Sequence, residues 1–166
     1  MIPSLTAAGM HPRAQEFVTR ARDLGVEADV HEFDEGTKTA AAAAEAVGCE
    51  VGAIASSIAV RAGDDLVVCV TSGANRVDMG AIADLRDVPE SDVGMADADA
   101  IRETLGWSIG GVPPFCHDTD VPVYLDETLT DHGTVWAAAG TPRAVFPIDP
   151  DRLREIAGAT VADFTE

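Results

Sequence analysis

Two apolar runs joined by a short turn constrain the fold of this chain more than any other feature. Residues 57–61 and 66–70 are strand-like, and Gly63, Asp64 and Asp65 lie in the turn between them. Two such runs separated by a few residues that include glycine are typical of a β-hairpin. The sequence therefore predicts an antiparallel pair of strands as part of a sheet.

Further strands and helices are interspersed along the rest of the chain. Where apolar residues recur at helical spacing, or a short polar side chain can cap the first turn, helices are predicted over residues 12–24, 40–47, 78–85, 97–105 and 149–158. Additional strands are predicted at residues 28–33, 121–125, 135–139 and 144–148. The strands cluster and do not alternate regularly with helices. This pattern predicts the α/β class, with a central mixed, largely antiparallel sheet surrounded by helices. We expect one domain over residues 1–166.

The charge of the chain is strongly negative. Eleven basic residues stand against 29 acidic ones, for a net charge of −18. Such an excess destabilises a compact fold by self-repulsion in dilute salt, whereas near 1 M salt the screening length falls to about 3 Å. We therefore expect a halophilic protein. Acidity ordinarily argues against nucleic-acid binding, but that argument weakens at molar salt, where a nucleic-acid end can be held by hydrogen bonds.

Targeting, metal and cofactor signals are absent from the sequence. No segment approaches the roughly 18 apolar residues of a membrane span, and the first ten residues do not read as a signal peptide. We expect a cytoplasmic protein with no membrane partner. Cys49, Cys69 and Cys116 lack zinc spacing and no dinucleotide or P-loop motif occurs, so no metal and no cofactor is predicted. Only Cys116 is a candidate reactive thiol.

A glycine–proline loop is the strongest candidate for a functional site. Residues 110–117 read Gly-Gly-Val-Pro-Pro-Phe-Cys-His, and the strand that follows ends on Asp126. Paired glycines let the backbone approach a ligand closely, and the prolines stiffen the exit of the loop. The alternatives are a tight turn before an edge strand for the loop and a strand-end cap for Asp126.

Six segments, in their order and spacing, resemble the YbaK/prolyl-tRNA editing family, aminoacyl-tRNA deacylases that act in trans. The segments are Thr37-Lys38-Thr39-Ala40, Ile54-Ala55-Ser56-Ser57-Ile58, Ser72-Gly73-Ala74-Asn75-Arg76-Val77-Asp78, Gly110-Gly111-Val112-Pro113-Pro114-Phe115, Pro122-Val123-Tyr124-Leu125-Asp126-Glu127 and Ala138-Ala139-Gly140. The resemblance implies an α/β domain that binds the 3′ end of mischarged tRNA and hydrolyses the ester of a small amino acid such as alanine or cysteine. It also suggests an aminoacyl-tRNA synthetase as a partner.

The resemblance places the aminoacyl pocket at the glycine–proline loop. Main-chain N–H groups of Gly110 and Gly111 are expected to stabilise the oxyanion. Val112 and Pro113 are expected to limit the volume of the pocket, and Pro114 to line it.

Four further residues are candidates for substrate binding. Asp126 is expected to orient the ammonium or ribose groups, and Gly73 and Arg76 to contact the substrate. The alternative for Arg76 is a solvated loop. His117 is a candidate proton shuttle, with a turn-holding histidine as the alternative.

One position departs from the family. Much of the family has lysine where this chain has Ser56, and that lysine is thought to contact the terminal ribose and phosphate. Ser56 is a candidate catalytic residue because it keeps a hydroxyl donor, although it loses the charge. Three readings follow: catalysis through the backbone and water alone; an arginine, Arg76 or Arg143, that supplies the charge; or a module that binds without hydrolysis. A halophilic α/β protein with another ligand is the remaining alternative.

Overall fold

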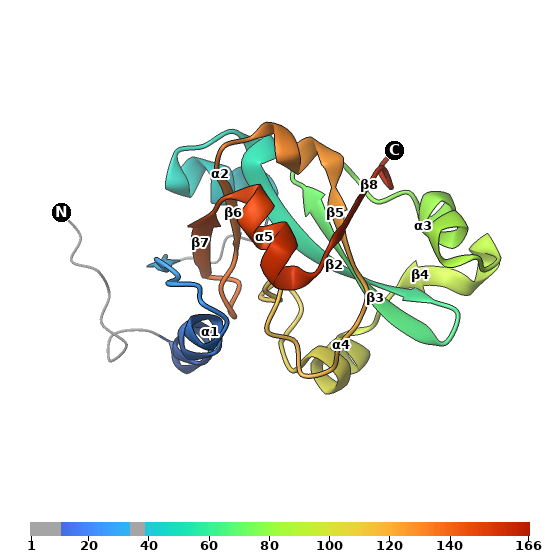
Figure 1. Ribbon diagram of the computed structural model, residues 1–166, viewed down its shortest axis with the longest axis horizontal. Helices are drawn as coiled ribbons and strands as arrows, with labels where there is room; N and C mark the ends of the chain where they lie inside the picture. Colours follow the sequence, from blue (N-terminus) through green and yellow to red (C-terminus); the bar gives the residue numbers. More distant parts are fainter. Residues whose placement is uncertain (1–10, 34–38) are drawn as a thin grey trace.

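The computed structural model describes residues 11–33 and 39–166, in which a mixed sheet of eight strands carries helices on both faces (Figure 1). The strands are β1 (His31–Glu32), β2 (Ile54–Ala62), β3 (Asp65–Ser72), β4 (Val93–Met95), β5 (Val123–Asp126), β6 (Val135–Ala138), β7 (Ala144–Ile148) and β8 (Thr160–Ala162). Their order is β1-β7-β6-β2-β3-β5-β8, and β4 pairs with β2. Pairs β1–β7, β2–β3, β2–β4 and β6–β7 are antiparallel, and β2–β6, β3–β5 and β5–β8 are parallel. The predicted mixed α/β fold is confirmed.

The β2–β3 hairpin forms the centre of the sheet, as the opening pattern predicts. Its register pairs Ser57 with Val70, and both strands are longer than the sequence indicated. The predicted strand at 28–33 is reduced to β1. The short strands β4 and β8 were not predicted, because three residues with exposed or half-buried side chains give no clear alternation.

The helices begin at the residues that the capping pattern indicated. They are α1 (Pro12–Asp23), α2 (Ala40–Val47), α3 (Met79–Arg86), α4 (Ala98–Leu105) and α5 (Pro150–Ala157), with short 3₁₀ segments at Val51–Ala53, Glu90–Asp92 and Glu127–Asp131. The side chains of Thr39, Asp78, Asp97 and Asp149 each accept a hydrogen bond from a first-turn N–H. His11 caps α1 through Nδ1, which accepts from the N–H of Arg13.

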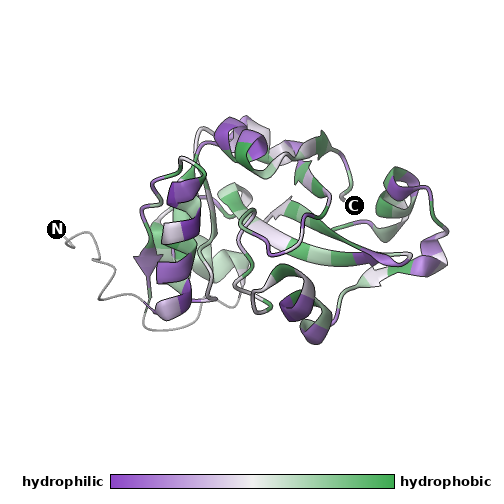
Figure 2. Cartoon of the chain, turned by 60° about the horizontal axis from the view of Figure 1, so that its bottom comes forward, coloured by the Kyte–Doolittle hydropathy of each residue, from purple (hydrophilic) through white to green (hydrophobic). Residues whose placement is uncertain are grey.

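The two faces of the sheet are covered by different helices. Helices α1, α4 and α5 contribute Phe17, Leu105 and Leu153 to the larger core, whereas α3 packs Ile82 against the other face. Helix α2 packs on β2 and β6 through Ala43 and its neighbours. Figure 1 shows α2 and α3 toward opposite ends of the molecule, and Figure 2 shows the outward side of α1 as largely hydrophilic.

An aromatic cluster fixes the glycine–proline loop to the larger core. Phe115 stacks on Phe17, with ring centroids 5.7 Å apart, and contacts Phe146 edge-on at 5.9 Å. The indole of Trp107 donates a hydrogen bond to the carbonyl of Cys116 at 2.9 Å, which ties the two ends of the loop together. The loop therefore presents its remaining residues from a rigid base.

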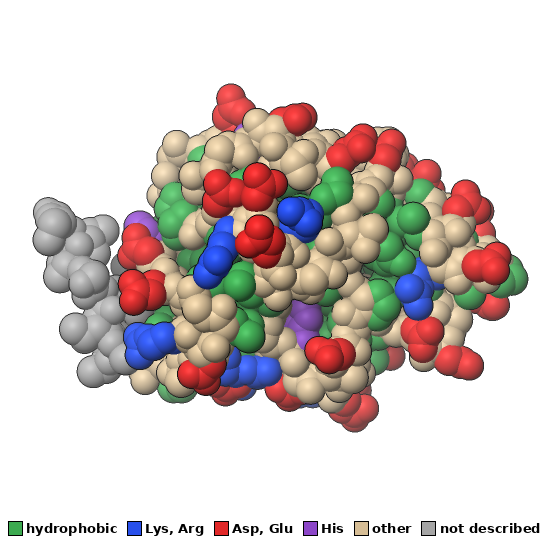
Figure 3. All heavy atoms as spheres, viewed as in Figure 1, with side chains coloured by type: hydrophobic (Ala, Val, Ile, Leu, Met, Phe, Trp, Pro, Cys, Tyr) green, Lys and Arg blue, Asp and Glu red, His purple; other side chains and the backbone are tan. Residues whose placement is uncertain are grey.

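Acidic side chains are scattered over the visible face in Figure 3 and are more numerous there than basic ones. This distribution follows from the net charge of −18. Molar-salt dependence of stability stays a prediction. None of the helices in the described part of the chain has the length and apolar character needed to cross a bilayer.

Candidate functional site

A cavity of about 1200 Å³ opens beside β2, between helix α2 and the turns at residues 108–111 and 141–143. Strand β2 contributes every residue from Ile54 to Ala59 to its wall. The remaining wall comes from the start of α2, from β6 and β7, and from Ile109, Gly110 and Val112 of the glycine–proline loop. A cavity of this size has room for a small amino acid together with a nucleoside.

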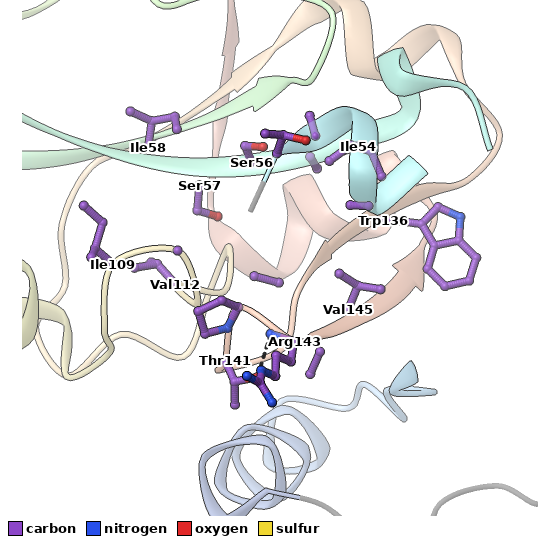
Figure 4. A pocket seen from close by; sticks show the side chains of 18 of the residues that line it. Ile54, Ser56, Ser57, Ile58, Ile109, Val112, Trp136, Thr141, Arg143 and Val145 are labelled. Carbon is purple, nitrogen blue, oxygen red and sulfur yellow. Dashed lines mark hydrogen bonds between the residues drawn. The ribbon is translucent and has the colours of Figure 1, made fainter. Parts of the chain in front are cut away.

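Two adjacent serines of β2 face opposite sides of the strand (Figure 4). Ser56 lies on the side of Ile54, which packs with α2, whereas Ser57 points toward the loop that carries Val112. The alternation of strand side chains requires this arrangement. The Ser57 Oγ is buried and has no hydrogen-bond partner among the described residues. Both serines line the cavity.

The paired glycines do not both present a free amide. Ser108 to Gly111 form a turn in which the Gly111 N–H donates to the carbonyl of Ser108 at 3.0 Å. Gly110 has φ +87°, which glycine adopts without strain, and its N–H makes no backbone hydrogen bond within the described part of the chain. The expectation of two oxyanion donors is therefore corrected: Gly111 is engaged in the turn, and only Gly110 lies at the cavity.

Arg143 places a positive charge at the cavity. Its main chain is held from both sides, since its N–H donates to Thr141 Oγ1 at 3.0 Å and its carbonyl accepts from the N–H of Phe33 at 2.9 Å. The side chain is exposed and makes no ion pair with any described residue. Among the described lining residues it is the sole arginine or lysine, while Glu32 and His11 lie at the same wall.

Three predicted substrate contacts lie away from the cavity wall. Asp126 is completely buried, and its carboxylate accepts hydrogen bonds at 3.0 Å from the N–H of Ser72, the amide of Asn75 and the N–H of Thr128. These contacts assign Asp126 a structural role, in keeping with the strand-end alternative. Arg76 is exposed on a loop. Gly73 packs against α2, and a Cβ there would come within 2.6 Å of Ala40 Cβ.

The last residues of the glycine–proline loop line a second, smaller hollow. His117 lines that hollow, and its Nε2 donates to the carbonyl of Pro113 at 2.8 Å. Burial lowers the pKa of His117, although the bond to Pro113 opposes the shift. Pro113 and Pro114 are buried and do not line the large cavity. Burial likewise raises the pKa of the Cys116 thiol to about 11, so this cysteine is not an activated nucleophile.

Of the predicted site residues, the structure thus brings Ser56, Gly110 and Val112 together at one cavity. Sequence reasoning did not single out Ser57 and Thr141, although each carried a signal. Ser57 is a hydroxyl on a strand face whose neighbours, Ala55 and Ala59, are core residues. Thr141 belongs to a second glycine–proline turn, at 140–142.

The assembled wall can bind a ligand that is apolar in one part and charged in another. Val112, Ile58 and Ile109 supply apolar surface, the two serines and Gly110 supply hydrogen-bonding groups, and Arg143 supplies a cation. Donors that point into a partly closed cavity can stabilise charge that develops on a carbonyl oxygen. Within residues 11–33 and 39–166, no three histidine, cysteine or acidic side chains are grouped so that they could hold a metal ion.

Comparison with known proteins gives one consistent result. Residues 34–156 match the sequence profile of the aminoacyl-tRNA editing domain. The uncharacterized protein YwhH of Bacillus subtilis (strain 168) is 32% identical over 136 residues, which are 81% of this chain and 85% of that protein. A crystal structure described as a candidate trans-editing enzyme for prolyl-tRNA synthetase is 39% identical, with a TM-score of 0.89, and the match covers 95% of this chain and 99% of that one. A structure from work on the computational grafting of linear epitopes onto scaffold proteins is also 39% identical, with a TM-score of 0.88 and the same coverage.

Proposed function

This chain belongs to the aminoacyl-tRNA editing domain family, and from that premise we propose that it is a deacylase that acts in trans on mischarged aminoacyl-tRNA. One observation carries the proposal. Two segments of the family resemblance, 54–58 around Ser56 and 110–115 after Gly110, both line the cavity beside β2. These are the segments to which the resemblance assigns catalytic roles. We propose a small amino acid, alanine or cysteine, on the proline acceptor as the group removed.

The reaction asks little of the protein because an aminoacyl ester is already activated. A water molecule adds to the ester carbonyl, and the bond from that carbon to the ribose oxygen of the tRNA breaks. The ribose oxygen takes up the proton that the water gives up, so the free amino acid is released. The Gly110 N–H, together with one serine hydroxyl of β2, can stabilise the developing oxyanion. Val112 limits the space for the side chain, and such a steric sieve discriminates one methylene by about 1–3 kcal/mol.

We assign the missing positive charge to Arg143. Ser56 cannot replace the charge of a lysine, but the guanidinium of Arg143 lies at the same cavity wall and its main chain is fixed. An arginine forms paired hydrogen bonds with a phosphate, and a contact pair of this kind retains its geometry when salt screens longer-range attraction. Arg143 therefore contacts the terminal phosphodiester of the tRNA.

Arg143→Gln is expected to raise KM for mischarged tRNA by about tenfold or more, with kcat changed little. A hydrogen bond to a charged group contributes about 1.5–3 kcal/mol, and about 1.4 kcal/mol is tenfold in binding. Steady-state deacylation in molar KCl measures both constants. Arg76→Gln is the matched control, because Arg76 is exposed and lies off the cavity wall. Equal kinetics of the two variants would remove Arg143 from substrate binding.

The proposed activity is tested by incubating the protein with Ala-tRNA and Cys-tRNA charged on the proline acceptor, in molar KCl. We expect the ester to be hydrolysed well above the spontaneous rate, and correctly charged Pro-tRNA to be spared. Failure to release any amino acid from either mischarged tRNA would overturn the proposal.

The absence of lysine at position 56 favours a second candidate function, a module that binds the aminoacyl end without hydrolysing it. Binding of a non-hydrolysable aminoacyl-adenosine without turnover of the corresponding ester would support this alternative. Ser56→Lys separates the two functions. A large gain of hydrolysis would indicate a site that has lost its chemistry, whereas a deacylase that uses Arg143 gains little.

A further inference from the structure

The central sheet is interrupted along one edge of β2, where the cavity lies. On one side β2 is paired with β3 from Ala55 to Ala62. On the other side β6 pairs only with Ile54 and Ala55, and β4 pairs only with residues 60–62. Among the described residues, no strand therefore pairs with residues 56–59 on that side. All four of these residues line the cavity.

The main-chain groups of Ser57 point into this interruption. Polar main-chain groups of successive strand residues face alternate edges. The carbonyl of Ala59 faces the β4 edge, because it accepts from the N–H of Ala96 at 3.1 Å. The carbonyl of Ile54 faces the β3 edge, because it accepts from the N–H of Gly73 at 2.8 Å. Both bonds place the odd-numbered residues, and so the N–H and the carbonyl of Ser57, toward the open edge.

The side chain of Ser57 adds a third polar group at the same position. Its Oγ is buried without a hydrogen-bond partner in the described part of the chain, and it points toward the loop that carries Val112 (Figure 4). Buried polar groups are normally paired, because an unpaired donor or acceptor costs about 1–3 kcal/mol. This buried hydroxyl lies beside a main-chain N–H and a carbonyl that no described strand pairs, and together the three groups indicate a polar ligand.

We propose that the aminoacyl group of the substrate occupies this interruption as one missing residue of the sheet. Its α-ammonium donates to the carbonyl of Ser57, and its ester carbonyl accepts from the N–H of Ser57. An aminoacyl group carries a donor and an acceptor on either side of one Cα, as does a strand residue that exchanges two bonds with its opposite neighbour. This inference rests on the proposed function and names how its substrate is held.

Main-chain pairing gives a specificity that side-chain volume alone does not give. A substrate whose α-amino group is removed loses the bond to the Ser57 carbonyl. An N-acylated substrate loses the charge and carries extra bulk into the interruption. A D-aminoacyl group cannot make both bonds while keeping its side chain on the same face. The site therefore selects free L-aminoacyl groups, whatever their small side chain.

The test compares three non-hydrolysable adenosine amides in molar KCl by calorimetry: L-alanyl, D-alanyl and propionyl, the last without an amino group. We expect the propionyl and D-alanyl compounds to bind about tenfold or more weakly than the L-alanyl compound. Glu32 is the one carboxylate among the described residues of the cavity wall, so Glu32→Gln is the control. It should leave the ratio of the affinities for the L-alanyl and propionyl compounds unchanged. Ser57→Pro removes an N–H that no neighbouring strand uses, so we expect folded protein with at least tenfold weaker binding.

Equal affinity for the L-alanyl and propionyl compounds would overturn the inference, even if mischarged tRNA is hydrolysed and the proposed function stands. The inference would also be overturned if Glu32→Gln bound the L-alanyl and propionyl compounds equally well, because the ammonium would then be held by the Glu32 carboxylate. If Ser57→Pro does not fold, the ligand series with the unaltered protein still decides. Absence of both binding and hydrolysis in the unaltered protein would overturn the proposed function, and this inference with it.

Discussion

Gly111→Val is expected to abolish deacylation and to lower the stability of the protein. A Cβ at this position would lie 2.7 Å from Thr141 Cα and 2.9 Å from the N and C atoms of the same residue. These are main-chain atoms, so no flexible side chain can move aside. The glycine–proline loop and the turn at 141–143 must separate, and both line the cavity.

The expected loss of activity is about hundredfold or more, because a displacement of about 1 Å in a catalytic site has effects of that size. Overpacking of this kind also costs about 1–3 kcal/mol of unfolding free energy. Deacylation rates and urea unfolding in molar KCl measure the two effects. Gly133→Ala is the matched control, since a Cβ at Gly133 meets no atom within 4 Å. Unchanged activity in Gly111→Val would show that the packing of the two turns does not shape the site.

The parts of the fold that the sequence predicted are those set by local interactions. The β2–β3 hairpin depends on two apolar runs and the short turn at Gly63, which lie next to each other in the chain. The helices that begin after Thr39, Asp78 and Asp97 depend on a side chain and an N–H two or three residues away. Patterns of this range can be read without knowledge of the rest of the molecule.

The geometry of the site depends on contacts between segments that are distant in the sequence, and it could not be predicted from local patterns. Sequence reasoning identified the glycine–proline loop and Ser56, but it did not show that the Gly111 N–H closes a turn onto Ser108. It also did not reveal the open edge of β2. That edge exists because β6 stops pairing at Ala55 and β4 starts at Val60, and neither boundary has a local signature.

Arg143 illustrates how the structure selects between alternatives that the sequence leaves equal. Arg76 and Arg143 were equivalent candidates for the charge that Ser56 lacks. The structure places only Arg143 at the cavity, because the turn at Thr141 directs it there, while Arg76 lies on an exposed loop. The choice between them required knowledge of which loops meet in space.

For Asp126 the structure changes the expected role: the family resemblance implied a substrate contact, but the residue holds the fold together. It stands at the end of β5, where its carboxylate accepts from Ser72 and Asn75 at the end of β3 and from Thr128 in its own segment. The side chain is completely buried, so it has no surface to offer a ligand. Its contribution to function is to hold the end of β3 against the end of β5.

Asp126→Ala is expected to destabilise the protein by about 3–5 kcal/mol. The substitution removes the acceptor of three hydrogen bonds: a buried one from the Ser72 N–H and two partly buried ones from the Asn75 amide and the Thr128 N–H. A buried donor left without an acceptor costs about 1–3 kcal/mol, and each lost hydrogen bond adds about 0.5–1.5 kcal/mol. Native stabilities are about 5–15 kcal/mol, so this is a large share of the total. For a chain of this size we expect a melting temperature roughly 10 °C lower. Thermal melting in molar KCl measures the shift.

Glu127→Ala is the matched control, because its carboxylate is adjacent in sequence but exposed. It should leave the melting temperature within about 2 °C of the unaltered protein, since surface substitutions usually cost less than about 0.5 kcal/mol. Asp126→Asn keeps one acceptor but turns an NH₂ toward a donor, so its stability should fall between those of Asp126→Ala and the unaltered protein. Activity of Asp126→Ala measured well below its melting temperature separates structure from chemistry. If activity is lost there while the melting temperature is unchanged, Asp126 acts on the substrate after all, and the buried network is not its role.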